Sequence, residues 1–468
     1  MIFDLLPESL LLGLMVLLFV LVLAKPGKDV VGAWLPAGCL AVLAAAGASL
    51  GRSALLFGGT YQVDPLSQFM KAAVALGLFI AVTNSGRQAT LREEVRADYA
   101  LLLCLSAWGL MLLASAVELM TIYVSLEISS YALYAVIPLR AGDRRAAEAG
   151  IKYVLFGAAA TAVSLYGFAY ISAAQHTTFL HELAGREWDF ATNPGALVGL
   201  VMFMAGFMYK LALFPFHFWC PDVYQGASNE TAAFAATLPK LGAVVVLVRL
   251  ASLLVPGQPG MTILAILGAV SMTFGNLAAL AQDDVKRMLG YSSVAHAGYV
   301  TIGLVAGSAD GLASASFYAL VYILMNLTCF WVVCHLSKDG RNINYADLDG
   351  LHGRSPVLAF VLAVSAFSLV GLPPTAGFMG KLFLLTSAWG RGYDWLVIIA
   401  ALNTAISIYF YLSLVRHAYT HDQQAEPVPA KGGGMALGAL FAALILLIGV
   451  LPAPVYELAV QAGRSLMP

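Results

Sequence analysis

Charged residues are scarce in this chain: Lys, Arg, Asp and Glu make up 11% of its 468 residues, whereas soluble domains carry about 25%. Hydrophobic residues account for 60%. The formal net charge of −1 provides no basic surface of the kind that nucleic acids require. Five cysteines without a CxxC spacing indicate neither a disulfide framework nor an iron–sulfur cluster, and we interpret them as small packing residues. This composition is that of a polytopic membrane protein.

The N-terminus lacks Lys and Arg before its first apolar run, MIFDLLPESLLLG. A secretory signal peptide would begin with a basic region. We therefore expect this run to be a retained first transmembrane helix.

Long apolar runs, by contrast, are plentiful, and a bilayer span needs about 20 apolar residues. We expect an all-α polytopic membrane protein with about fourteen transmembrane helices, near residues 8–25, 31–50, 64–85, 97–114, 117–138, 148–174, 193–222, 229–253, 259–282, 288–307, 312–337, 355–390, 394–419 and 433–454.

Most of the Lys and Arg residues outside the predicted spans fall in loops on one side of the membrane. An even number of spans puts both termini on the same side, and Lys and Arg favour cytoplasmic loops. Fifteen of them fall on one side: Lys25, Lys28, Arg87, Arg92, Arg96, Arg140, Arg144, Arg145, Lys286, Arg287, Lys338, Arg341, Arg354, Arg416 and Lys431. Five fall on the other: Arg52, Arg186, Arg249, Arg391 and Arg464. We therefore expect a bacterial inner-membrane protein with both termini on the periplasmic side.

One stretch combines a charge at membrane depth with broken backbone. Residues 208–226, MYKLALFPFHFWCPDVYQG, carry Lys210 and two helix-breaking prolines, Pro215 and Pro221. A lysine at the bilayer centre costs roughly 2.5–3.5 kcal/mol, and broken backbone is tolerated there only beside protein or a water-filled cavity. We interpret this combination as part of an ion pathway.

The chain also contains a weak internal repeat. The seventh and twelfth spans are both interrupted by proline, and each carries one lysine near its break, Lys210 and Lys381. The two spans lie an odd number of helices apart, so they have opposite orientations, as in inverted-repeat transporters. We expect helices 1–3 in residues 1–90, two inverted five-helix repeats in residues 91–255 (helices 4–8) and 256–422 (helices 9–13), and a last helix in residues 423–468.

Ionisable residues within the spans are the candidate functional residues. Glu127 is the only acid at the middle of a predicted span, and Lys210 is its natural counter-charge, although the sequence does not establish contact. Lys240 and Lys381 also lie within spans. A buried lysine with a movable carboxylate partner can bind and release protons near neutral pH. His296, at the repeat position that corresponds to Glu127, can pass a proton either way.

Each of these residues also has a structural interpretation. A buried glutamate can stay protonated in a helix contact, a lysine can snorkel to the interface, and a histidine can pack with its hydrogen bonds satisfied. Lys152, about one turn into the sixth span, suits snorkelling and proton relay equally. For Lys71, near the outer end of the third span, snorkelling is favoured.

Four stretches resemble a known family: EAGIKYVLFGAAATAVSLYGFAYI (148–171), KLALFPFHFWCPDVYQGA (210–227), GNLAALAQDDVKRMLGYSSVAHAGY (275–299) and GLPPTAGFMGKLFLL (371–385). They look like the antiporter-like membrane subunits of bacterial NADH-quinone oxidoreductase (respiratory complex I), and like the subunit N branch in particular. The resemblance runs from about residue 60 to 420. Lys381 stands where the subunit M branch has a glutamate, and the chain ends soon after the last helix, without the long lateral helix of the subunit L branch.

The resemblance implies fourteen helices with discontinuous helices 7 and 12, and a central polar axis of Glu127, Lys210, Lys240 and Lys381, with Lys152 close to it. It implies no cofactor in this chain, but NADH, flavin, iron–sulfur clusters and quinone in the assembled complex. The implied partners are other antiporter-like and small hydrophobic membrane subunits. One departure is the loop 226–230, GASNE, which replaces the proline-containing turn usual in the family.

We therefore expect a proton-translocating subunit of an NADH-quinone oxidoreductase, an enzyme whose redox chemistry takes place in other chains. Subunits of cation/proton antiporters and of membrane-bound hydrogenases share the same core and remain alternatives. A purely structural membrane anchor is a further alternative. The buried charges argue against an anchor, because apolar residues would anchor at lower cost.

Overall fold

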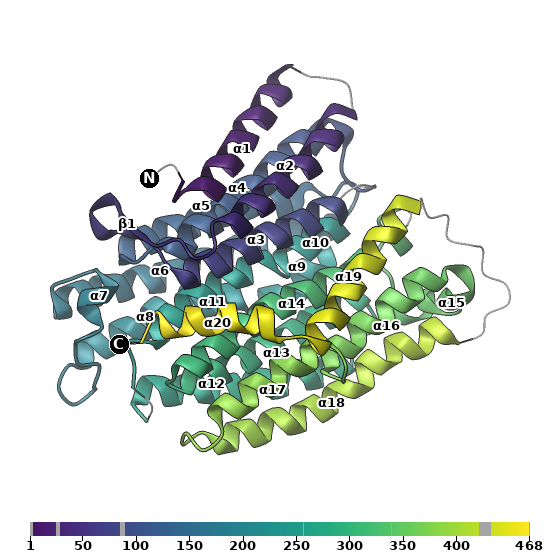
Figure 1. Cartoon of the computed structure of the whole chain (residues 1–468). Helices are drawn as coiled ribbons and strands as arrows, with labels where there is room; N and C mark the ends of the chain where they lie inside the picture. The colour runs from purple at the N-terminus through teal and green to yellow at the C-terminus, as the bar shows by residue number, and fades with distance from the viewer. Residues whose placement is uncertain are drawn as a thin grey trace.

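The computed structural model describes residues 3–24, 29–84, 89–255, 257–337, 339–420 and 432–467, without the side chains of residues 29–33, 432 and 433. Within these ranges the chain is almost entirely α-helical (Figure 1). The elements are α1 (Leu6–Ala24), α2 (Asp29–Ala48), β1 (Ala54–Leu56), β2 (Tyr61–Val63), α3 (Pro65–Asn84), α4 (Arg96–Ser115), α5 (Leu119–Val136), α6 (Arg144–Gln175), α7 (Leu180–Leu183), α8 (Pro194–Leu211), α9 (Trp219–Gly226), α10 (Asn229–Ala235), α11 (Leu238–Ala251), α12 (Pro259–Leu280), α13 (Val285–Val305), α14 (Ala309–Leu336), α15 (Leu351–Arg354), α16 (Pro356–Val370), α17 (Ala376–Ala388), α18 (Asp394–Tyr419), α19 (Gly432–Val450) and α20 (Ala453–Arg464).

The helices follow the apolar runs, so the predicted all-α membrane fold is confirmed. Among the described residues, ten helices are long and apolar enough to cross a membrane, or up to eleven if α19 and α20 form one span. The total of fourteen stays a prediction. Polar residues set several helix starts: the side chains of Asp143, Asn193 and Asp284 accept hydrogen bonds from the first backbone amides of α6, α8 and α13.

Both predicted breaks are present. The seventh span divides into α8 and α9, with Pro215 between them, and the twelfth into α16 and α17, with Pro373 and Pro374 between them. The prediction that Pro221 also breaks the helix is wrong. It lies in the first turn of α9, where the missing backbone N–H has no intrahelical partner to lose.

Three features were not predicted. The eighth span is divided into α10 and α11 around Ala236 and Thr237. The strands β1 and β2 form an antiparallel hairpin in which Ala54 lies opposite Val63. The last span bends by 71° between α19 and α20, and α20 then packs across α14 and α3 (Figure 1). The bend lies at Leu451–Pro452, inside the predicted span 433–454.

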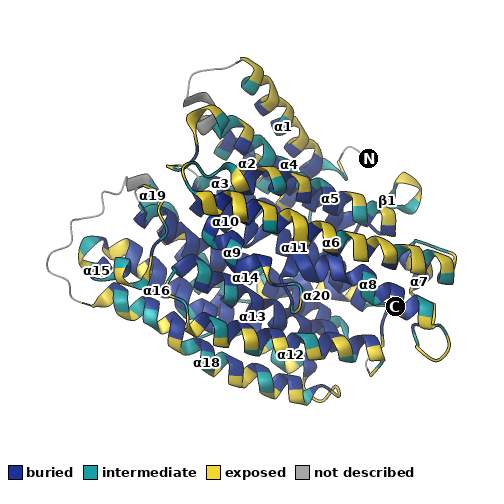
Figure 2. Ribbon diagram, turned by 180° about the vertical axis from the view of Figure 1, so that it is seen from behind, coloured by how far each residue is buried: buried dark blue, intermediate teal, exposed yellow. Residues whose placement is uncertain are grey.

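Burial separates inner from outer helices. The helices α10, α11 and α14 are buried almost throughout, whereas α6 and α18 expose one side along their length (Figure 2). Hydrophobic residues exposed on these outer helices suit contact with lipid or with other membrane subunits. The innermost helices therefore form the core in which a buried charge would meet only protein.

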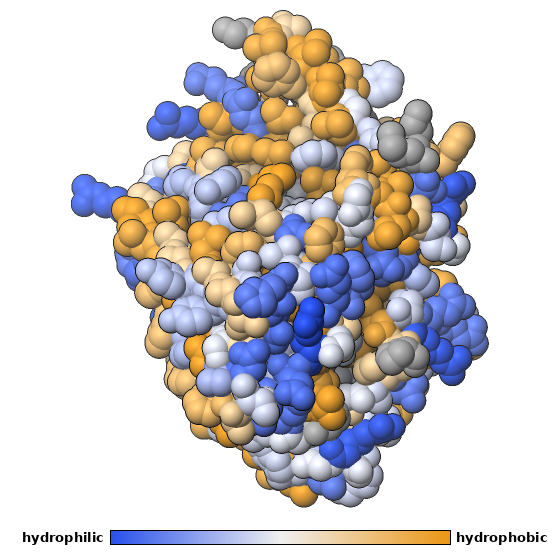
Figure 3. All heavy atoms as spheres, turned by 90° about the vertical axis from the view of Figure 1, so that its left-hand side faces the viewer, coloured by the Kyte–Doolittle hydropathy of each residue, from blue (hydrophilic) through white to orange (hydrophobic). Residues whose placement is uncertain are grey.

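Both ends of the chain lie on the same side of the molecule (Figure 1). On the face that carries them, hydrophilic side chains gather across the middle and hydrophobic ones lie around them (Figure 3). This arrangement fits helix ends that meet water at a membrane surface. Of the positive charges predicted for the opposite side, five lie outside the described residues: Lys25, Lys28, Arg87, Lys338 and Lys431.

Candidate functional site

Lys210 lies in the last turn of α8, directly before the first break, and its side chain is buried. Its Nζ donates a hydrogen bond to the hydroxyl of Tyr153 on α6, at 2.9 Å. The same Nζ lies 4.9 Å from the ring centre of Tyr153 and 5.8 Å from those of Tyr134 and Tyr209. Aromatic faces attract a cation, so this group of rings partly replaces the water that the ammonium lacks.

Glu127 lies on α5 and is buried as predicted. Its carboxylate accepts a hydrogen bond from the hydroxyl of Thr161, at 2.9 Å. Within the described part of the chain, no ion pair joins Glu127 to Lys210, whose nearest polar partner is the hydroxyl of Tyr153. The two groups therefore act on each other through space rather than by direct contact, and a small movement of α5 or α8 would change that interaction.

A buried lysine satisfies the last carbonyl before each break. Lys240 Nζ donates to the carbonyl of Leu211, the last residue of α8, at 2.9 Å. Lys381 Nζ donates to the carbonyl of Val370, the last residue of α16, at 2.8 Å. Carbonyls at the end of a helix lack intrahelical partners and carry the negative end of the helix dipole, so both positions favour a cation.

A small cavity lies between Lys240 and His296. It is lined by both residues together with Ser293 and Tyr322, and its free space of about 10 Å³ is close to what one water molecule needs. Lys240 and His296 therefore line the same small cavity, in which the hydroxyls of Ser293 and Tyr322 are hydrogen-bonded to each other.

His296 uses both of its ring nitrogens. Nδ1 lies 2.6 Å from the hydroxyl of Tyr318, and Nε2 lies 3.0 Å from that of Tyr411. Tyr299, whose ring lies 6.0 Å from that of His296, has Lys381 Nζ over its face at 4.3 Å. The chain thus brings Lys240, His296 and Lys381 into one buried band of lysines, imidazole and hydroxyls, which we call the polar belt.

Lys152 lies apart from the polar belt. Its side chain is 35% exposed and forms ion pairs of 2.6 Å with Glu148 and with Asp222. Asp222 also pairs with Arg287, at 2.6 Å. Lys152 therefore belongs to a partly exposed charged cluster with Glu148, Asp222 and Arg287.

The unusual loop 226–230 is the centre of a second network, on the side opposite the termini. The carbonyl of Ala227 accepts hydrogen bonds from Lys286 Nζ at 2.8 Å and from Arg140 Nη1 at 3.2 Å. Lys286 is fully buried, although its sequence position had placed it among the loop charges. Two cations thus meet the carbonyl end of α9, where the helix dipole favours them.

Two further buried ion pairs were missed from the sequence. Lys71, expected to snorkel, is fully buried and pairs with Glu8 of α1 at 2.6 Å. Arg249, expected in a loop, forms a two-pronged pair with Asp64, at 2.8 and 3.0 Å. The available signal was the helical spacing of Asp64, Gln68 and Lys71, which puts these polar residues on one side of a mostly apolar stretch.

The Asp64 carboxyl is kept ionised by its hydrogen-bonding and charged partners. Burial raises the pKa of this carboxyl, but the charge of Arg249 and the hydrogen bonds from Arg249 and Ser67 outweigh burial. The pKa of Asp64 is therefore lowered, and the pair is ionic at neutral pH.

The C-terminal helices pack on the second break. A Cβ atom at Gly449 of α19 would lie 2.1 Å from the carbonyl oxygen of Pro374 and 2.4 Å from the carbonyl carbon of Thr375. Beyond the bend, Tyr456 stacks on Phe383 of α17, with ring centres 3.9 Å apart. The C-terminal segment thus holds the half-helix that carries Lys381.

Among the described residues, no group of three or more His, Cys, Asp or Glu side chains could hold a metal ion. The five cysteines are free and buried, as expected of packing residues. The polar belt itself consists of lysines, an imidazole and tyrosine hydroxyls, which are groups that can bind and release protons.

The sequence of this chain is similar to those of known membrane proteins. Residues 116–407 match the family described as NADH:quinone oxidoreductase/Mrp antiporter, TM. A relative from Solidesulfovibrio magneticus, named NADH-quinone oxidoreductase subunit N 2, is 61% identical over 468 residues and covers 100% of both chains. A relative of the same name from Opitutus terrae is 46% identical and covers 96% of this chain and 95% of its own length.

A solved structure shares the fold. A chain of respiratory complex I from Thermus thermophilus superposes with a TM-score of 0.84 at 33% identity, covering 96% of this chain and 98% of that chain. The matched segment 116–407 includes Glu127, Lys210, Lys240, His296 and Lys381, the residues singled out from the sequence. The chain therefore belongs to the NADH:quinone oxidoreductase/Mrp antiporter family of membrane proteins.

Proposed function

We propose that this chain is the proton-translocating subunit N of a respiratory NADH-quinone oxidoreductase in a bacterial inner membrane. The observation that carries the proposal is the polar belt, in which buried lysines meet the carbonyl ends of both broken helices. Such charges are expensive at membrane depth and are retained where ions move. The names of the relatives from Solidesulfovibrio magneticus and Opitutus terrae support the choice of complex.

Each residue has a role in this proposal. The negative charge of Glu127 stabilises the charged form of Lys210 without direct contact, and a shift of α5 or α8 weakens this stabilisation. Lys210 and Lys240 are linked by the end of α8, because Lys240 donates to the carbonyl of the residue that follows Lys210. A change of charge at Lys210 therefore alters the field at Lys240.

The proton then crosses the polar belt. It passes from Lys240 through a water in the adjoining cavity to His296, and on through tyrosine hydroxyls toward Lys381. Lys152, with Glu148 and Asp222, stands at the edge that faces water and can exchange protons with it.

The redox chemistry belongs to other subunits in this proposal. NADH, flavin, iron–sulfur clusters and quinone are bound elsewhere in the complex, and this chain receives only a conformational or electrostatic signal. The exposed apolar sides of α6 and α18 are suited to contact with lipid and with other antiporter-like or small hydrophobic subunits. The termini face the periplasm, which leaves the more basic loops in the cytoplasm.

Glu127→Gln tests this function. In the whole complex reconstituted in sealed vesicles, the variant should assemble but translocate few protons during NADH oxidation by quinone. Glu118→Gln is the matched control, because Glu118 lies on the same segment and only caps the start of α5. Normal translocation by Glu127→Gln would refute the proposal and favour a structural anchor.

A cation/proton antiporter subunit is the second candidate, because the matching family also contains Mrp antiporters. Vesicles that hold the purified complex without any electron donor separate the two. An antiporter exchanges protons for sodium down an imposed gradient, whereas the proposed subunit translocates protons only while electrons flow.

A further inference from the structure

Four charged side chains are buried where the N-terminal segment packs against α11, apart from the polar belt. They form two ion pairs, Glu8 with Lys71 and Asp64 with Arg249, and none of the four side chains is more than 6% exposed. Replacement of buried ion pairs by apolar residues is often neutral or stabilising. Stability alone therefore gives no reason for two such pairs in adjacent helices.

The two pairs are connected along one face of α3. Asp64, directly before α3, and Gln68 and Lys71 on it follow the spacing that aligns side chains on one side of a helix. Gln68 is fully buried, and neither its amide oxygen nor its amide nitrogen has a hydrogen-bond partner among the described residues. Glu8 Oε2 and Arg249 Nε are likewise buried and unpartnered in the described chain. These atoms are the donors and acceptors that a short internal water chain requires.

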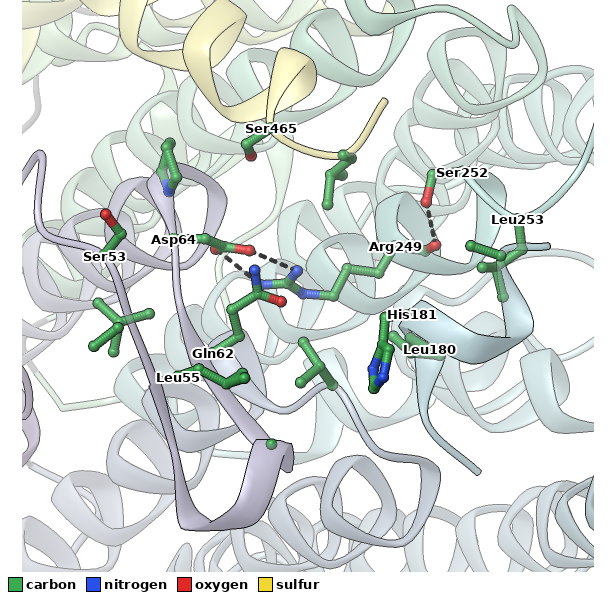
Figure 4. A pocket seen from close by; sticks show the side chains of 17 residues that line it. Ser53, Leu55, Gln62, Asp64, Leu180, His181, Arg249, Ser252, Leu253 and Ser465 are labelled. Carbon is green, nitrogen blue, oxygen red and sulfur yellow. Dashed lines mark hydrogen bonds and ion pairs between the residues drawn. The ribbon is translucent and has the colours of Figure 1, made fainter. Parts of the chain in front are cut away.

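The Asp64–Arg249 end of this face reaches the surface. Both residues line a cavity of about 690 Å³ on the side of the termini, together with Gln62, His181 and Ser465. Figure 4 shows the paired side chains within this pocket, between the β-hairpin and the end of α11. Water in the cavity therefore meets the first of the two ion pairs directly.

The Glu8–Lys71 end is built for proton exchange within the pair. The Lys71 nitrogen lies 2.6 Å from Glu8 Oε1, and the hydroxyl of Tyr61 donates to the same oxygen at 2.6 Å. Burial and the nearby Glu8 carboxylate raise the pKa of Tyr61, so the phenol stays protonated as a donor. Of the two groups that contact this oxygen, Lys71 is therefore the one that supplies a proton to the carboxylate.

We propose that Glu8, Lys71 and Gln68, with Asp64 and Arg249 lining the cavity, form a second proton-conducting site on the side of the termini. In the transfer step an N–H bond of the Lys71 ammonium breaks and an O–H bond forms on Glu8, which leaves both groups neutral. The carboxylic acid then releases its proton to water on the Gln68 face, and the cavity receives it. The neutral Lys71 amine takes up a new proton from the protein interior, which restores the ion pair. Arg249 lies nine residues beyond Lys240 on α11, roughly 13 Å along the helix. The site thus stands at the terminus-side end of the helix that carries Lys240 into the polar belt, and it rests on the proposed function.

Gln68→Leu is the first test, in the whole complex reconstituted in sealed vesicles. The substitution conserves volume and removes two unpartnered polar atoms, so a purely structural role predicts a complex that is equally or more stable and fully active. The proposed site predicts instead a lower ratio of protons translocated to electrons transferred, with assembly unchanged. A wild-type ratio in Gln68→Leu would overturn the proposal.

The double variant Glu8→Gln with Lys71→Met is the second test. It removes both charges together and leaves no buried charge unpaired, so a structural ion pair would be replaced without loss of translocation. The proposed site predicts a ratio as low as that of Gln68→Leu. If Glu127→Gln abolishes translocation while Gln68→Leu and the double variant keep the wild-type ratio, the proposed function stands and this second site is refuted. Normal translocation by all of them would refute the proposed function itself.

Discussion

Replacement of Lys381 by methionine should stop proton translocation while the complex still assembles. The substitution removes the donor to the carbonyl of Val370, which costs about 1–3 kcal/mol. It also removes the cation over the ring of Tyr299, which contributes about 0.5–2 kcal/mol. Against these losses stands the removal of a lysine from membrane depth, which costs about 2.5–3.5 kcal/mol to bury. The opposing terms nearly cancel, and the net change in stability should stay within about 2 kcal/mol.

Two measurements check this prediction. The thermal transition of the purified complex should remain close to that of the wild type, while the initial rate of proton translocation by vesicles falls to the background of uncoupled vesicles. Leu382→Met is the matched control, because it places the same side chain on the same helix at a position that is 37% exposed. Normal translocation by Lys381→Met would show that this lysine only closes the end of α16, and would refute the reasoning.

Two other changes have defined outcomes. Gly449→Ala should displace the second break and slow translocation, because its Cβ would lie 2.1 Å from the carbonyl oxygen of Pro374. Gly434→Ala on the same helix should leave translocation intact, because its nearest contact would be His335 Nε2 at 3.2 Å. Equal effects of the two on translocation would contradict a positioning role for α19. Asp64→Asn leaves Arg249 buried without a charged partner and should destabilise the protein by about 3–5 kcal/mol. The measurement is a lower thermal transition temperature. Because the pKa of Asp64 is lowered in the folded chain, the stability from this pair is complete above the ordinary carboxyl pKa of about 4 and is lost as the pH falls through the lowered value. If the thermal transition temperature of the wild type falls no further in acid than that of Asp64→Asn, the ionic Asp64–Arg249 pair would be contradicted.

The fold and the breaks could be predicted because their signals are local. Apolar length determines where a helix can span a membrane, and a proline removes a backbone donor wherever it stands. Lys210 and Lys381 were found for the same reason: a lysine beside a break inside an apolar run is visible without a structure. Pro452 carried a similar signal, but its position near the end of the last run concealed the bend that packs α20 across α14.

The partners of these lysines could not be predicted, because they come from distant parts of the chain. Lys210 and Tyr153 are 57 positions apart, and Lys71 and Glu8 are 63 positions apart. Only the packing of helices brings such groups together. Opposite charge suggested Glu127 as the partner of Lys210, whereas the aromatic rings around this ammonium provide its first contacts. Burial was misjudged for Lys71 and Arg249, since distance from the end of a span does not reveal what another helix places there.

The central claim is that protons cross the polar belt from the first break to the second. Lys240 joins the two halves, because it donates to the last carbonyl of α8 and faces His296 across the small cavity. The most direct measurement is the ratio of protons translocated to electrons transferred by the Lys240→Met complex in sealed vesicles. The account predicts a ratio clearly below that of the wild type, with the complex assembled. An unchanged ratio would contradict it.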